Sequence, residues 1–72
     1  MKYRYSLFGK ELNATLDKLE AKGWYIVFED DYEHIYVLQK DTEQGYAEMT
    51  VKYTCNDNDD WIVHTAKVAY HR

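Results

Sequence analysis

The spacing of hydrophobic residues changes near the N-terminus, from every second residue to every third or fourth. Residues 2–7 alternate polar and apolar side chains, which is the period of a β-strand with one buried face. Over residues 9–22, Leu12, Leu16 and Leu19 recur at helical spacing among good helix formers. The chain is therefore predicted to begin with a short strand and to continue with an amphipathic helix.

Four segments rich in β-branched and aromatic residues follow Gly23, a glycine at the position after the helix where a positive φ is favoured. Their short connections force neighbouring strands to be antiparallel, while the helix lets the second strand run parallel to the first. The sequence thus predicts a single α+β domain over residues 1–72, with one helix packed on a mostly antiparallel sheet of four to five strands in the order β-α-β-β-β-β. The four segments lie at about residues 24–29, 34–40, 46–55 and 60–70.

The register of the last hairpin can be predicted, because a slip of one residue moves every side chain to the opposite face of the sheet. With residues 56–59 as the loop, one face becomes mainly apolar, and Glu48 faces Lys67 on the exterior. His64 then lies on the core face as a partly buried, structural imidazole. The predicted core-face pairs are Ala47 with Val68, Met49 with Ala66, Val51 with His64, and Tyr53 with Ile62.

The hairpin formed by the segments at about residues 24–29 and 34–40 leaves a second apolar group on the outer face of the sheet. Pairing Phe28 with Ile35 places every second residue of both strands on the core face. The alternate residues then share the face that no helix covers, and an exposed apolar patch of this kind is typical of a contact surface. Coverage by the N-terminal segment or by neighbouring strand ends is the alternative. The predicted protein-binding patch consists of Tyr25, Val27, Tyr36 and Leu38.

The composition restricts the class of protein. Of the 72 residues, 46% are hydrophobic and 17% aromatic, which differs from a disordered chain, and the single cysteine allows no internal disulfide. A net charge of −4 argues against direct binding to a nucleic-acid backbone. No apolar run approaches the ~18 residues of a membrane span, and the first residues lack the apolar stretch of a signal peptide. We therefore expect a cytoplasmic protein that contacts neither nucleic acid nor membrane directly.

Seven of the 13 carboxylates are predicted to gather at one end of the sheet. The first and third turns of an antiparallel meander lie at the same end, and here both turns are acidic. The helix N-terminus is expected to point to this end, where its positive dipole offsets part of the repulsion. Solvated turns are the alternative interpretation, since Asp and Asn favour turns for backbone reasons. This group, the acidic pole, consists of Glu29, Asp30, Asp31, Glu33, Asp57, Asp59 and Asp60.

The sequence predicts no catalytic residue, no cofactor and no metal site. The three histidines and Cys55 show no ligand spacing, and His34 is expected to face Glu29 as an ordinary cross-strand partner. The isolated glycines form no loop that could cradle a phosphate. The loop at residues 57–60 lacks the alternating ligands and central glycine of a calcium loop.

Two functions from different classes fit these patterns. The first is a small non-enzymatic protein–protein interaction module, which uses the outer patch to form a homodimer or to bind one heterologous protein. The second is an acidic, phage-type inhibitor or adaptor that mimics nucleic acid, with its acidic pole in the basic site of a nucleic-acid-handling protein. An enzyme ranks third, because it would need a pocket of ~300 Å³ or more lined by desolvated acids.

Overall fold

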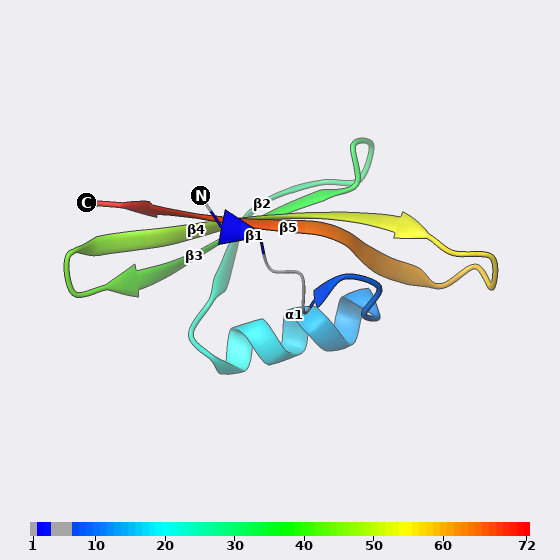
Figure 1. Cartoon of the computed structure of the whole chain (residues 1–72), viewed down its shortest axis with the longest axis horizontal. Coiled ribbons are helices and arrows are strands. Elements are labelled where there is room, and N and C mark those ends of the chain that lie inside the picture. Colours follow the sequence, from blue (N-terminus) through cyan, green and yellow to red (C-terminus); the bar gives the residue numbers. More distant parts are fainter. Residues whose placement is uncertain (1, 4–6) are drawn as a thin grey trace.

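The computed structural model describes residues 2–3 and 7–72, and it describes side chains from Leu7 onward. Helix α1 (Leu12–Ala21) lies on one face of an antiparallel sheet, as Figure 1 shows. The sheet order is β1-β5-β4-β3-β2, with every neighbouring pair antiparallel. The strands are β1 (Lys2–Tyr3), β2 (Tyr25–Asp30), β3 (Ile35–Thr42), β4 (Gly45–Cys55) and β5 (Trp61–His71).

The prediction of an α+β domain with one helix on an antiparallel sheet is confirmed, but the first strand is shorter than predicted. The expected strand over residues 2–7 is represented by the two-residue β1, residues 4–6 lie outside the described residues, and Leu7 is already in a turn. The Lys10 amide closes this turn on the Leu7 carbonyl at 3.1 Å. Among the described residues the sheet therefore has four long strands and the two-residue edge strand β1.

The helix begins later than the predicted residue 9, because the preceding backbone is engaged with β5. The Gly9 amide donates to the Val63 carbonyl at 2.8 Å, and the Val63 amide donates back to the Lys10 carbonyl at 2.8 Å. Glu11 is the N-cap, and its carboxylate accepts a hydrogen bond from the Ala14 amide at 2.6 Å. These bonds tie the helix N-terminus to one position on the sheet.

The helix ends at the predicted glycine. Gly23 has a φ of 99°, and its amide donates to the Glu20 carbonyl at 3.0 Å. The Trp24 amide donates to the Leu19 carbonyl at 3.0 Å, and the Trp24 side chain enters the core. The chain thus turns from the helix directly into β2.

The core lies between α1 and the middle of the sheet. Buried leucines at helical spacing face the sheet, and the buried residues of the central strands alternate, as expected for a sheet with one covered face. The buried apolar residues are Leu12, Leu16, Leu19, Trp24, Leu38, Ala47, Met49, Val51, Tyr53, Val63, Ala66 and Val68.

The last hairpin has a register that the sequence did not predict. Met49 faces Val68, a shift of two residues from the predicted pairing, so the same residues stay on the core face. Between Thr65 and Val63 the register shifts once more, and His64 becomes an extra residue in a β-bulge. Val63 is buried, while His64 is exposed. The predicted core position of His64 is therefore wrong, because the bulge reverses the alternation of β5.

In the hairpin of β2 and β3, the faces are the reverse of those predicted for β3. Leu38 faces Met49 of β4 and is fully buried, while Tyr36 faces Val51 and packs against the core. Pairing with β4 determines which face of β3 is buried, and the β2–β3 hairpin alone does not determine it. The predicted outer positions of Tyr36 and Leu38 are therefore wrong.

Candidate functional site

The structure brings the two acidic turns together at one end of the molecule. The β2–β3 turn, the β4–β5 turn and the N-terminus of α1 lie at the same end, opposite the β3–β4 turn and the C-terminus (Figure 1). The His34 carbonyl at the end of the first turn accepts a hydrogen bond from the Tyr53 amide of β4 at 3.0 Å. This backbone hydrogen bond ties the first turn to β4, the strand that leads into the second turn.

At each of these turns, one side chain accepts hydrogen bonds from the backbone amides of the turn. The Asp30 carboxylate accepts hydrogen bonds from the amides of Tyr32 and Glu33, at 2.9 and 3.1 Å. Asn56 does the same in the other turn, where its side-chain oxygen accepts from the Asn58 and Asp60 amides. The solvated-turn interpretation therefore accounts for Asp30. The other six carboxylates of the acidic pole are exposed.

A pocket of about 260 Å³ opens at the acidic pole. One wall comes from the first turn of α1, and the others come from the β2–β3 turn and from the ends of β3, β4 and β5. Aromatic rings dominate its lining, and one carboxylate joins them. We call it the pole pocket; it is lined by Leu12, Asn13, Asp31, His34, Tyr36, Tyr53 and Trp61.

Tyr53 lies at the centre of the aromatic lining. Its ring centroid is 5.2 Å from that of His34, 5.4 Å from that of Tyr36 and 5.4 Å from that of Trp61. The His34 ring stacks on Tyr53, and the Trp61 ring meets both of them edge-on, at 84° to Tyr53 and 70° to His34. Tilted and edge-to-face contacts at this range are attractive. The lining is thus a cluster of rings from three segments, in which Tyr53 is buried and Trp61 is 41% exposed.

Burial and nearby carboxylates both act on the two tyrosines of this cluster. Burial is the main cause that raises the pKa of Tyr53 above its usual value, followed by its neighbour Tyr36 and by the carboxylates of Asp31 and Glu29. Burial likewise leads the causes that raise the pKa of Tyr36, followed by the charges of Glu29 and Asp31. The same charges that disfavour a phenolate here favour a positive charge brought into the pocket.

His34 has a different role from the predicted one. Glu29 faces Tyr36, whereas His34 lies beyond the strand pairs in the turn, with a φ of 58°. This left-handed conformation is uncommon outside glycine, and the two ring contacts of His34 accompany it. The predicted cross-strand contact of His34 with Glu29 is therefore wrong, and His34 instead joins the first hairpin to the second.

The four residues of the predicted binding patch are divided between two faces. Tyr25 and Val27 are exposed, whereas Leu38 is buried and Tyr36 lines the pole pocket. Val27 is the extra residue of a bulge in β2, and the Tyr25 hydroxyl donates to the Asp41 carboxylate at 3.4 Å. A different apolar set shares the outer face of β2 and β3, and we call it the outer-face group: Tyr25, Phe28, Ile35 and Val37.

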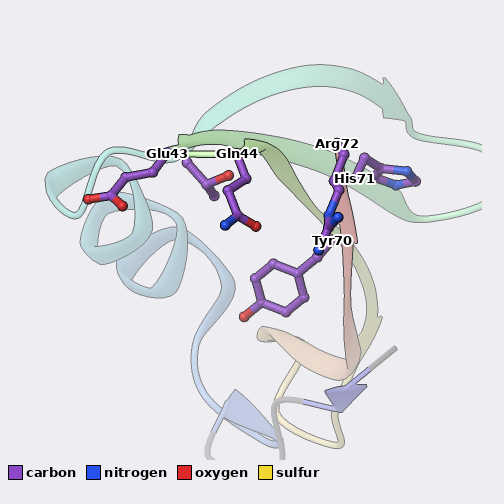
Figure 2. A pocket seen from close by; sticks show the side chains of 6 residues that line it. Glu43, Gln44, Tyr70, His71 and Arg72 are labelled. Carbon is purple, nitrogen blue, oxygen red and sulfur yellow. The ribbon is translucent and has the colours of Figure 1, made fainter.

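A second pocket, of about 490 Å³, lies at the opposite end of the sheet. Figure 2 shows Gln44 of the β3–β4 turn and Tyr70 of β5 pointing into the same open space, with His71 directed elsewhere. His71 stacks on Tyr46 with a centroid distance of 4.8 Å. All six lining residues are exposed, whereas Tyr53 in the pole pocket is buried.

The described part of the chain contains no group of three or more His, Cys, Asp or Glu side chains placed to hold a metal ion. Within the same residues, no helix has the length and apolar character needed to cross a membrane. No family model matches the chain, and comparisons with curated proteins and with solved structures find no significant match either.

The sequence predicted the acidic residues of this site and named Tyr36 as a binding residue, although on the other face of the sheet, but it did not predict the rings of His34, Tyr53 and Trp61 beside it. Tyr36 and Tyr53 are diagonal neighbours once Tyr36 faces Val51, so the correct β3–β4 register was the signal that could have found this pair. Trp61 reaches Tyr53 only because of the β5 bulge, which no sequence pattern announced.

Proposed function

We propose that this chain is a small non-enzymatic protein–protein interaction module whose acidic pole binds a basic surface of another protein. The observation that carries the proposal is the position of the two acidic turns at one end of the molecule (Figure 1), where the aromatic-lined pole pocket with Asp31 also opens. Aromatic residues are enriched at protein interfaces, and carboxylates select a positively charged partner. A basic site that otherwise holds nucleic acid is the kind of partner surface that such a pole fits.

Rigidity supports this role. The turn at residues 30–34 is closed by the Asp30 carboxylate and is bonded through its His34 carbonyl to the Tyr53 amide. Charges held on fixed turns lose little conformational entropy when a partner binds. The net charge of −4 gives the whole domain the same sign as its pole, which accelerates encounter with a basic partner.

The experiment compares two triple variants that carry the same net charge. The pole variant is Glu33→Gln/Asp57→Asn/Asp60→Asn, and the control variant is Asp17→Asn/Glu20→Gln/Glu43→Gln; each raises the formal charge from −4 to −1 by removing three exposed carboxylates. An octalysine peptide is the probe, followed by fluorescence anisotropy. At about 0.5 kcal/mol for each exposed ion pair, the pole variant should bind roughly tenfold more weakly than the wild type.

The control variant should lose much less affinity, because its three carboxylates lie outside the acidic pole. Binding should also weaken steeply with salt, since the Debye length falls from ~10 Å at 0.1 M to ~3 Å at 1 M ionic strength. Equal losses in the two variants would mean that only net charge matters, and salt-insensitive binding would mean that charge does not drive it. Either result overturns the proposal.

A second candidate function is self-association through the outer sheet face. Its support is the outer-face group on edge strand β2, where Phe28 is 53% exposed and the neighbouring Val27 is also exposed. Light scattering across a concentration series should then detect a dimer at both low and high salt. Phe28→Glu should dissociate it, while the control Tyr32→Glu, at the tip of the β2–β3 turn, should not. A monomer at every concentration contradicts this candidate.

A further inference from the structure

We infer that the pole pocket receives a single arginine side chain of the basic partner, with its guanidinium against the exposed rings and near Asp31. This inference rests on the proposed function and adds to it the chemistry of one specific contact. General attraction between the acidic pole and a basic surface requires no pocket. The arginine contact requires the aromatic lining, so the two ideas can be separated by experiment.

The lining has the composition of a cation site. Three of its seven residues are Tyr or Trp, whose ring faces bear the negative part of the ring quadrupole. Asp31 adds a carboxylate at the same pocket, and the carboxylate of Glu29 lies close enough to act on Tyr36. An anionic ligand would meet repulsion from both the carboxylates and the ring faces. The pocket therefore selects positive charge.

The rings are in place before any ligand arrives. Tyr53 contacts the three other rings at centroid distances of 5.2 to 5.4 Å, and its amide is bonded to the His34 carbonyl. Tyr53 is 8% exposed, so the core supports the pocket from below. Trp61 is the most exposed of these rings, and it supplies surface to the incoming side chain. A preformed pocket of this kind does not spend binding free energy on ordering its own walls.

The positive end of α1 also borders the pocket, through Leu12 and Asn13, and it would oppose a cation if it were left open. One of its amides, that of Ala14, is capped by a carboxylate of the helix itself. The Glu11 carboxylate accepts from the Ala14 amide at 2.6 Å, and the Glu11 carbonyl accepts from the Thr15 amide and the Thr15 hydroxyl, at 3.0 and 2.7 Å. This cap places a further negative charge at the helix N-terminus. The pocket thus keeps its preference for a cation.

Arginine fits this lining better than lysine does. The guanidinium is planar, stacks on aromatic rings and pairs with a carboxylate through two parallel hydrogen bonds, whereas an ammonium is compact and strongly hydrated. A wall of tilted rings next to a single carboxylate provides both kinds of contact. We therefore expect one arginine among lysines to be preferred over a further lysine.

The test uses octalysine and the same peptide with one central arginine. The arginine peptide should bind the wild-type chain at least about threefold more tightly, and Trp61→Leu should remove this preference without abolishing binding of octalysine. In NMR titrations, the indole signal of Trp61 should shift with the arginine peptide, while that of the buried Trp24 stays fixed. These outcomes support the pocket contact directly.

A second pair of variants keeps the test decisive if Trp61→Leu does not fold. Asp31→Asn and Asp57→Asn each remove one exposed carboxylate of the acidic pole, but only Asp31 lines the pocket. Asp31→Asn should reduce the preference for arginine, whereas Asp57→Asn should weaken both peptides equally. Equal binding of the two peptides, with no shift of the Trp61 indole, overturns the arginine contact and leaves the proposed function intact. Failure of both peptides to bind overturns the proposed function as well.

Discussion

Replacing Leu38 with alanine tests which face of β3 is buried. Leu38 is fully buried opposite Met49, whereas its neighbour Val37 lies half-buried on the outer face, opposite Thr50. Leu38→Ala removes the equivalent of about three methylene groups at ~0.8 kcal/mol each, and the cavity left behind raises the cost to about 3 kcal/mol. Val37→Ala removes less surface from a half-exposed site and should cost about 1 kcal/mol, including the lower strand preference of alanine.

Urea denaturation followed by far-UV circular dichroism measures both costs. A domain of this length has a free energy of unfolding of roughly 4–11 kcal/mol, so Leu38→Ala should visibly lower the urea midpoint or prevent folding altogether. Val37→Ala should shift the midpoint only slightly and leave its slope unchanged. If Val37→Ala cost as much as Leu38→Ala, or more, the faces of β3 would be those of the opposite register and the reasoning would be refuted.

Two further predictions concern pH and a close backbone approach. Because burial and nearby charges raise the pKa of Tyr53, the folded state keeps this phenol neutral, whereas an unfolded tyrosine ionises near pH 10. Stability should therefore fall as pH rises through and above about 10, and Tyr53→Phe should reduce this fall in urea midpoints measured from neutral to alkaline pH. Gly45 has a φ of 154°, and a Cβ there would overlap the His71 carbonyl oxygen and lie 2.7 Å from the Arg72 Cα. Gly45→Ala should cost about 2 kcal/mol in thermal melts, more than the control Gly9→Ala, whose Cβ would meet no atom within 4 Å at a φ of 77°.

The elements could be predicted because local patterns specify them. The leucine spacing indicated the helix, and Gly23 indicated its end. The acidic turns indicated where the strands are separated, and the observed strand bounds lie within a few residues of the predicted ones. The helix start could not be predicted, because the bonds between Gly9, Lys10 and Val63 join residues far apart in the sequence.

The faces of the strands were harder to predict, because they depend on pairing across the whole sheet. Considered alone, the β2–β3 hairpin allows either face of β3 to be buried, and β4 makes the choice by placing Met49 opposite Leu38. The apolar patch was therefore assigned to the wrong residues of β3, although an exposed apolar group does exist on the outer face. Tyr25 belongs both to the predicted patch and to the observed outer-face group.

The β5 bulge connects this difficulty to the candidate site. In the unbulged register that the sequence predicts, Ile62 faces the core beside Tyr53, and Trp61 points to the opposite face. The extra residue at His64 reverses the alternation, so that Val63 enters the core and Trp61 reaches Tyr53 and His34. The bulge interrupts the regular pairing of β4 with β5, and it directs the indole of Trp61 into the pole pocket. The place of Trp61 in the aromatic lining and the bulge in β5 are therefore one feature, and the sequence pattern that predicts a regular β5 also directs Trp61 away from the pocket.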